Sequence, residues 1–208
     1  MIRDLVPAHV VVMETMNPAS WEHELDPLEA AALGSVAPKR RTEYAAGRGL
    51  ARCGLIALGI EPEPIGRGPR REPVWPDGVV GSITHCDGYC GVALASTRHT
   101  AGIGIDAESR IISAPELITN VCTARERAGF PEHGSVDWPT LTFSAKEAIF
   151  KLWFVATRSG LAFHDVEIEF DVAREAFRAE FTRDSPFGLP LEGRFSAGRG
   201  LVFTAVHL

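Results

Sequence analysis

The chain has 208 residues, a length that suits one large folded unit or two fused small halves. Its residues are 45% hydrophobic, 8% aromatic and 23% charged, a balance that excludes collagen, a coiled coil and wholesale disorder. The net charge of -6 excludes a nucleic-acid binder that depends on an overall positive field, although a local basic pocket remains possible.

The sequence predicts neither a membrane helix nor a secretory signal, and its cysteines suggest no catalytic or metal-binding motif. No apolar run approaches the roughly 20 residues that a membrane helix needs, and the N-terminus carries acidic residues where a secretory signal would be basic. We therefore expect a cytoplasmic protein that binds no membrane. The four cysteines form no CxxC pair, and only Cys86 and Cys90 are close in sequence, so we expect reduced thiols without a catalytic role.

Residues 1–34 contain no clear motif, and the first strong element follows them. A helix is predicted from Pro38 to about residue 59, because it opens with proline and closes on glycine. The helical period places one set of side chains opposite the apolar stripe, which predicts a cationic ridge: Arg40, Tyr44, Arg48 and Arg52. Residues 61–78 are rich in Pro, Gly and Arg and predict a long, positively charged loop.

Three strands are expected next. The Asp87-Gly88 pair predicts a hairpin turn between the runs VVGSIT and GVALAS. The run AGIGIDAE predicts a third strand. Its period of two places Ile103, Ile105 and Ala107 on one face, and Gly104, Asp106 and Glu108 on the other. Two carboxylates therefore point the same way at the end of a strand.

The second half is predicted to contain two helices and an antiparallel meander. The first helix covers about residues 115–128, and the second begins near Ser144 and ends before Gly160. Four alternating runs follow within residues 166–208. Helices and strands are segregated within each half, which favours the α+β class.

Acidic and basic residues from this strand and the second helix suggest a metal site. Asp106 and Glu108 combine with Lys146, Glu147 and Lys151, and carboxylate oxygens suit magnesium, which borrows further ligands from substrate phosphates. Two plainer readings stay open. Glu147 and Lys151 fit an i,i+4 surface pair, and Ser144 with Glu147 fits a capping box.

Six arginines lie close together in this otherwise acidic chain: Arg40, Arg48, Arg52, Arg67, Arg70 and Arg71. Guanidinium groups match phosphate oxygens, so the cluster suits a polyanionic ligand, although it also fits a solvated face. His85, just before the predicted turn, suits donation to a phosphate, although an isolated histidine is more often structural or solvated.

Four motifs in order resemble the 4'-phosphopantetheinyl transferase superfamily. GIGIDAE at 102–108 and FSAKEAIFK at 143–151 look like its paired signature. RRTEYAAGR at 40–48 and REPVWPDGVVGSITHC at 71–86 look like the subclass of the enterobactin-synthesis enzyme and its actinobacterial relatives. The resemblance implies a pseudo-twofold pair of α+β halves with antiparallel sheets, coenzyme A in the cleft between them, and a monomer. We expect the halves to be residues 1–104 and 105–208.

The resemblance also implies roles for individual residues. Asp106, Glu108 and Glu147 would surround a magnesium ion that holds the pyrophosphate of coenzyme A, while water takes the position beside Ala107. The phosphates of the coenzyme would contact Arg40, Arg48 and Arg67, and His85 would touch the pyrophosphate. Lys146 and Lys151 would lie beside the reacting phosphoryl group. Arg52, Arg70 and Arg71 are weaker assignments.

The implied reaction transfers the phosphopantetheine arm of coenzyme A to a serine of an apo acyl or peptidyl carrier protein and releases adenosine 3',5'-bisphosphate. Glu147 is the candidate base, directly or through a water on the metal, and Lys151 would stabilise the developing charge. We expect polyketide, nonribosomal peptide or siderophore synthesis to be served, and no nucleic-acid partner. The alternatives are a non-catalytic module that binds coenzyme A or a nucleotide, and a metal-dependent phosphohydrolase.

Overall fold

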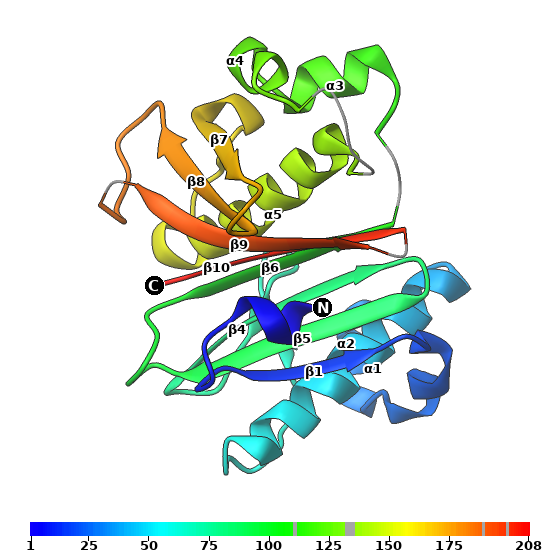
Figure 1. The fold of residues 1–208 in the computed structure, drawn as a ribbon. Coiled ribbons are helices and arrows are strands. Elements are labelled where there is room, and N and C mark those ends of the chain that lie inside the picture. Colours follow the sequence, from blue (N-terminus) through cyan, green and yellow to red (C-terminus); the bar gives the residue numbers. More distant parts are fainter. Residues whose placement is uncertain (110–111, 132–135, 189, 199) are drawn as a thin grey trace.

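The computed structural model describes residues 1–109, 112–131, 136–188, 190–198 and 200–208, without the side chains of residues 22–24. Four layers follow one another in space (Figure 1): α2 (Pro38–Ala57), a three-stranded sheet, a five-stranded sheet, and α5 (Trp138–Thr157). Helices and antiparallel sheets coexist, so the predicted α+β class is confirmed.

The three-stranded sheet belongs to the first half of the chain. Its strands β1 (Val11–Thr15), β5 (Tyr89–Ser96) and β4 (Val79–Cys86) lie in that order, and both pairings are antiparallel. The predicted hairpin is confirmed: Cys86 pairs with Tyr89, and Gly88 adopts a φ of 73°, which glycine tolerates without a Cβ clash. Strand β1 lies in a segment for which the sequence indicated no motif.

The five-stranded sheet belongs to the second half. Four of its strands form the predicted meander in chain order: β7 (Val166–Asp171), β8 (Ala176–Phe181), β9 (Leu191–Gly198) and β10 (Leu201–His207). Strand β6 (Ile103–Glu108), which carries the two carboxylates, pairs antiparallel with β10 and forms the edge of this sheet.

Short elements complete the fold: η1 (Ile2–Leu5), η2 (Pro18–Glu24), α1 (Pro27–Leu33), β2 (Gly66–Arg67), β3 (Pro73–Val74), α3 (Pro115–Val121), α4 (Ala124–Ala128) and η3 (Phe163–Asp165). Strands β2 and β3 lie inside the region predicted to be only loop. The helix predicted over 115–128 is two helices, because Thr123 caps α4 through its side chain and ends the run.

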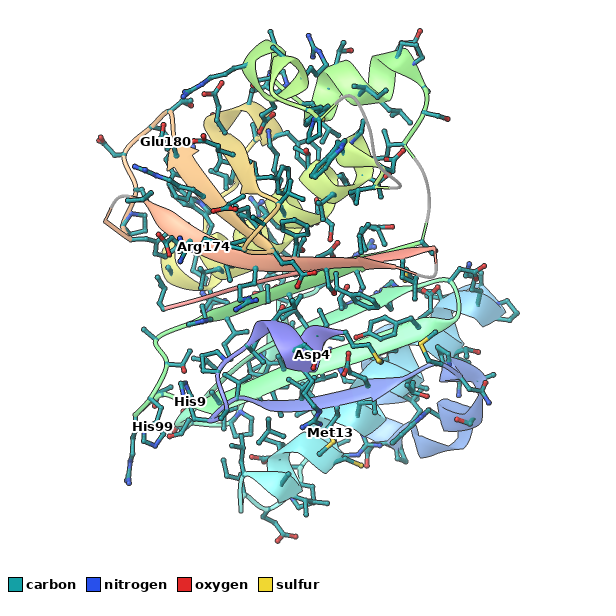
Figure 2. All side chains as sticks on the ribbon, in the orientation of Figure 1. Asp4, His9, Met13, His99, Arg174 and Glu180 are labelled. Atoms are coloured by element: carbon teal, nitrogen blue, oxygen red, sulfur yellow. The ribbon has the colours of Figure 1, made fainter. Side chains whose placement is uncertain are left out.

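Three apolar clusters hold the layers together. One lies between the two sheets and includes Ile2 and Leu5 of η1, which are both fully or almost fully buried. The second lies between α5 and the five-stranded sheet. The third lies between α2 and the three-stranded sheet, where Met13 of β1 packs against it (Figure 2). The N-terminal segment therefore helps to join the two halves.

The cysteines are free thiols, as the sequence predicted. Cys86, Cys90 and Cys122 are buried, and desolvation is the main cause that raises their pKa values to about 11, 12 and 11. Thiols with raised pKa values are poor nucleophiles at neutral pH. In the described part of the chain, no helix combines the length and the apolar character needed to cross a membrane.

Candidate active site

The site lies where the edge strands of the two sheets meet. Strands β4 and β6 run side by side, and side chains of β4 bind the backbone of β6: Ser82 Oγ accepts from Ile105 N at 3.1 Å, and Thr84 Oγ1 accepts from Ala107 N at 3.0 Å. Helix α5 packs closely on β6, since a Cβ on Gly104 would lie 1.9 Å from the Ala148 carbonyl oxygen. The face that carries Asp106 and Glu108 is therefore pressed toward α5.

Asp106 forms the centre of this site. Its side chain is 7% exposed, and its Oδ1 accepts from Lys151 Nζ at 2.7 Å and from the Thr84 hydroxyl at 3.2 Å. Lys151 also donates to the Ile105 carbonyl oxygen at 2.8 Å. Asp106 Oδ2 is buried and has no hydrogen-bond partner in the described part of the chain. A buried carboxylate oxygen without a donor is costly unless a cation binds it.

Glu147 lies one helical turn before Lys151 on α5. Burial raises the pKa of its carboxyl, Lys151 opposes this effect, and the charge of Asp106 adds to it. The capping-box reading of Glu147 is wrong, because α5 begins six residues earlier than Ser144. Asp137 caps the helix, and the Ser144 hydroxyl instead contacts Thr204 Oγ1 at 2.9 Å. The Glu147 carboxylate is therefore not used to cap the helix.

The donor set fits a hard cation such as magnesium. Asp106 and Glu108 share one face of β6, and the buried Asp106 Oδ2 offers an unused oxygen. Within the described residues, no group of three His, Cys, Asp or Glu side chains lies close enough together to hold a metal ion by itself. Magnesium usually takes only one or two carboxylates and completes its shell with water and substrate phosphate oxygens, so an all-protein cluster is not needed.

A small cavity of about 110 Å³ lies between α2 and β4. Its lining includes Arg40, Glu43, Tyr44, Arg48, Arg71 and His85. The Arg48 guanidinium lies 4.5 Å from the centre of the Tyr44 ring, and both residues are buried. Arg48 Nε and Tyr44 Oη lack hydrogen-bond partners among the residues that the structure describes. Two buried donors without acceptors indicate a place for anionic oxygens.

His85 faces this cavity together with two charged neighbours. Its Nε2 contacts Arg40 Nη1, and its Nδ1 lies 3.4 Å from Glu43 Oε2, which also lies 3.5 Å from Arg40 Nη1. Burial, and then the positive charges of Arg40, Lys151 and Lys39, lower the pKa of His85 to about 4. The imidazole is therefore neutral at physiological pH, and further negative charge bound in the cavity would favour its protonation.

The lowered pKa of His85 can be tested by following the titration of its ring directly. In the free protein, the His85 ring should titrate near the value of about 4 in nuclear magnetic resonance spectra. Arg40→Gln should raise that pKa, because it removes the largest charge effect, and Lys39→Gln should raise it less, because its effect is the smallest of the three cations. An unchanged His85 titration in Arg40→Gln would contradict the assignment.

The cationic ridge predicted for α2 is not one solvated face. Arg40 is exposed over 43% of its side chain, but Arg48 is buried in the cavity. Arg52 forms an ion pair with the buried Glu29, which also accepts from Ile65 N at 2.9 Å. Arg52 therefore helps to hold α1 against α2, and Glu29 also binds the segment around Ile65 that follows α2.

Two residues expected to bind coenzyme A have protein partners of their own in this structure. Arg67 donates to the Ala32 carbonyl oxygen at 3.1 Å and does not line the cavity between α2 and β4. Lys146 is only 1% exposed, and its ammonium binds Glu126, Val121 O and Phe163 O at 2.7–2.9 Å. Its three donors are thus already satisfied inside the second half.

A larger cavity of about 400 Å³ adjoins the small one, since Arg71 lines both. Its walls include Arg70, Arg71, Trp75, Phe150, Lys151 and Phe154. Arg70 and Arg71, which were the weaker assignments, therefore lie at the site. Their position in a loop of short strands gave no sequence signal that separated them from Arg67. Trp153, one of the apolar residues of α5, belongs to the core and stacks on Phe181.

Carboxylates beside a lysine, next to cavities lined by arginines, are suited to a phosphoryl-group transferase. Two family models match the chain: the 4'-phosphopantetheinyl transferase N-terminal domain over residues 28–95, and the 4'-phosphopantetheinyl transferase superfamily over residues 102–194.

Curated relatives agree with this match. The chain is 36% identical over 193 residues to the 4'-phosphopantetheinyl transferase PptT of Mycobacterium tuberculosis, across 88% of this chain and 85% of that protein. It is 39% identical over 217 residues to the transferase Svp of Streptomyces mobaraensis, across 99% and 88%. It is 39% identical over 124 residues to enterobactin synthase component D of Escherichia coli, across 59% of each.

The chain belongs to the 4'-phosphopantetheinyl transferase superfamily. It is an enzyme that uses coenzyme A as substrate and transfers the phosphopantetheine arm to a carrier protein. The alternatives of a non-catalytic nucleotide-binding module and of a phosphohydrolase are thereby set aside.

Proposed function

We propose that the transfer depends on magnesium, and that Asp106, Glu108 and Glu147 hold the ion. The observation that carries this proposal is the unpartnered, buried Asp106 Oδ2 beside the Glu147 carboxylate. When bound, the ion would neutralise the pyrophosphate of coenzyme A and polarise the reacting phosphoryl group.

The arginine cavity supports a site for the phosphates of coenzyme A. Arg40 and Arg48 present guanidinium groups there, and neutral His85 supplies a further polar contact. Arg67 remains the arginine that the resemblance implies, and Arg71, which lines both cavities, is a further candidate. Arginine forks bind phosphate oxygens with two parallel hydrogen bonds, which fixes the orientation of the coenzyme as well as its affinity.

The chemical step is a displacement at phosphorus. The serine oxygen of the carrier protein forms a bond to the β-phosphorus, and the bond from that phosphorus to the bridging oxygen breaks. Adenosine 3',5'-bisphosphate leaves with the electron pair. Glu147 accepts the serine proton, a role supported by its raised pKa. Lys151, held at 2.7 Å from Asp106 Oδ1, stabilises the charge on the bridging oxygen.

The wider context of the reaction is also a proposal. An acyl or peptidyl carrier protein of polyketide, nonribosomal peptide or siderophore synthesis would be the acceptor, which is supported by the name of the enterobactin synthase relatives. Carrier domains are generally acidic around their serine, so the arginines at the cavity mouth would guide docking. We further propose a cytoplasmic monomer whose halves are residues 1–104 and 105–208.

Intact mass spectrometry of an apo carrier protein tests the proposal. Incubation with this protein, coenzyme A and magnesium should add one phosphopantetheine arm, and a chelator should stop the gain. Asp106→Asn should slow the transfer at least about 100-fold, because it removes a charge at the reacting centre. Asp87→Asn is a matched control in the exposed hairpin turn and should leave the rate unchanged. Transfer by Asp106→Asn at the normal rate, or in full despite the chelator, would overturn the proposal.

A further inference from the structure

Thr84 binds the acid group across the boundary between the two sheets. It is only 2% exposed, and it lies on β4, whereas Asp106 lies on β6 of the other sheet. Its oxygen accepts from Ala107 N at 3.0 Å and lies 3.2 Å from Asp106 Oδ1. A hydroxyl has a single proton, and the amide already donates to this oxygen. The hydroxyl proton is therefore free to point at the carboxylate.

Thr84 and Lys151 approach the same oxygen of Asp106. Lys151 Nζ donates to Oδ1 at 2.7 Å, and the Thr84 hydroxyl donates to it at 3.2 Å. The second oxygen, Oδ2, is buried and receives no hydrogen bond from the described residues. The two donors fix the rotation of the carboxylate, so one oxygen is occupied and the other is directed into the site.

We propose that Thr84 is a positioning residue that holds the Asp106 carboxylate in the orientation in which Oδ2 meets the magnesium ion. This inference rests on the proposed metal role of Asp106 and adds a residue of the first half to it. In this role Thr84 is not itself a metal ligand. It acts through Asp106, as outer hydrogen bonds commonly orient a metal ligand.

Ser82 provides a matched comparison on the same strand. Its hydroxyl oxygen accepts from Ile105 N at 3.1 Å, as Thr84 accepts from Ala107 N, and it is 3% exposed. Both residues thus dock β4 on β6 through one backbone hydrogen bond. Of these two described residues, Thr84 but not Ser82 also contacts the Asp106 carboxylate. A loss of strand docking and a loss of carboxylate orientation can therefore be separated.

Binding of Mn²⁺ in the presence of coenzyme A, without a carrier protein, gives a readout that needs no turnover. Electron paramagnetic resonance measures free Mn²⁺ in such a titration. We expect Thr84→Val, which keeps the shape but lacks the hydroxyl, to weaken Mn²⁺ binding by about 10–100-fold. Thr84→Ser should stay within about threefold of the unchanged protein, because it restores the donor. Ser82→Ala should lower the melting temperature but leave the Mn²⁺ affinity unchanged.

The kinetics of transfer should also distinguish a loss of magnesium affinity from a loss of catalytic rate. Thr84→Val should raise the magnesium concentration needed for half-maximal transfer, while the rate at saturating magnesium falls far less. If Thr84→Val does not fold, Thr84→Ala takes its place in the titration. Unchanged Mn²⁺ affinity in the folded variant, or an equal loss in Ser82→Ala, would overturn the positioning role. If Asp106→Asn binds Mn²⁺ with normal affinity, the proposed role of Asp106 as a metal ligand is wrong. That result differs from a failure of the positioning role of Thr84 alone.

Discussion

Glu147→Gln should lower kcat by about 10²–10⁴-fold, the range over which a positioned general base contributes. The amide keeps the size of the side chain but cannot accept the serine proton. Glu147 is also a proposed magnesium ligand, so the two proteins should be compared with both magnesium and coenzyme A at saturating concentration. Single-turnover transfer separates this chemical step from binding. A near-normal rate would remove Glu147 from the base role.

The pH dependence of transfer gives a second test of the same carboxyl. Burial raises the pKa of Glu147 above its ordinary value, so its basic form is available at high pH and is lost as the pH falls through that raised value. The rate of the unchanged protein should therefore decline on the acidic side, and Glu147→Gln should lack this limb. Glu169→Gln, on the exposed side of β7, is the control and should keep the full profile.

Lys146→Met should destabilise the protein by about 3–5 kcal/mol, because it leaves the carboxylate of Glu126 buried without its partner. Both side chains of this ion pair are 1% exposed, and they lie 2.9 Å apart. Glu126 also accepts from Ile168 N at 2.8 Å, so the pair ties α4, β7 and α5 together. Desolvation lowers the pKa of Lys146, and Glu126 acts against that effect.

Urea unfolding measures this loss of stability. The double variant Lys146→Met/Glu126→Gln should lose less than the sum of its two single variants, since it leaves no unpaired charge. Lys39→Met is the matched control, because its ion pair with Asp87 is exposed and such pairs contribute at most about 1 kcal/mol. If Lys146→Met instead changes the stability little and loses much of its affinity for coenzyme A, the expected role of Lys146 in binding the coenzyme is supported.

Patterns within one element were sufficient to predict most of the fold. Pro38 predicted the beginning of α2, and the Asp87-Gly88 turn predicted the hairpin of β4 and β5. The alternation of apolar and polar residues predicted the meander. The start of α5 was missed, because Asp137 and Pro139 form a capping signal that lies before the predicted start near Ser144. The break at Thr123 was missed because its capping box follows another helix directly.

The candidate site was predicted where its chemistry lies in continuous motifs. Asp106 and Glu108 on one strand face, and Glu147 and Lys151 one helical turn apart, need only local geometry. The arginines could not be sorted in this way. Arg67 in β2 and Arg71 lie four residues apart, and only the path of the chain between them places Arg71 at the cavity and Arg67 beside Ala32.

The sequence by itself determined the α+β class, the family, and the strand and helix that carry the acids, because hydrophobic period, turn residues and motif order are local properties. The tertiary structure decided what each charged group faces. It directed Lys146 to Glu126 inside the second half, and it placed the Thr84 hydroxyl of one sheet on the Asp106 carboxylate of the other. The physical reason is that burial and ion pairing depend on contacts between segments far apart in the chain.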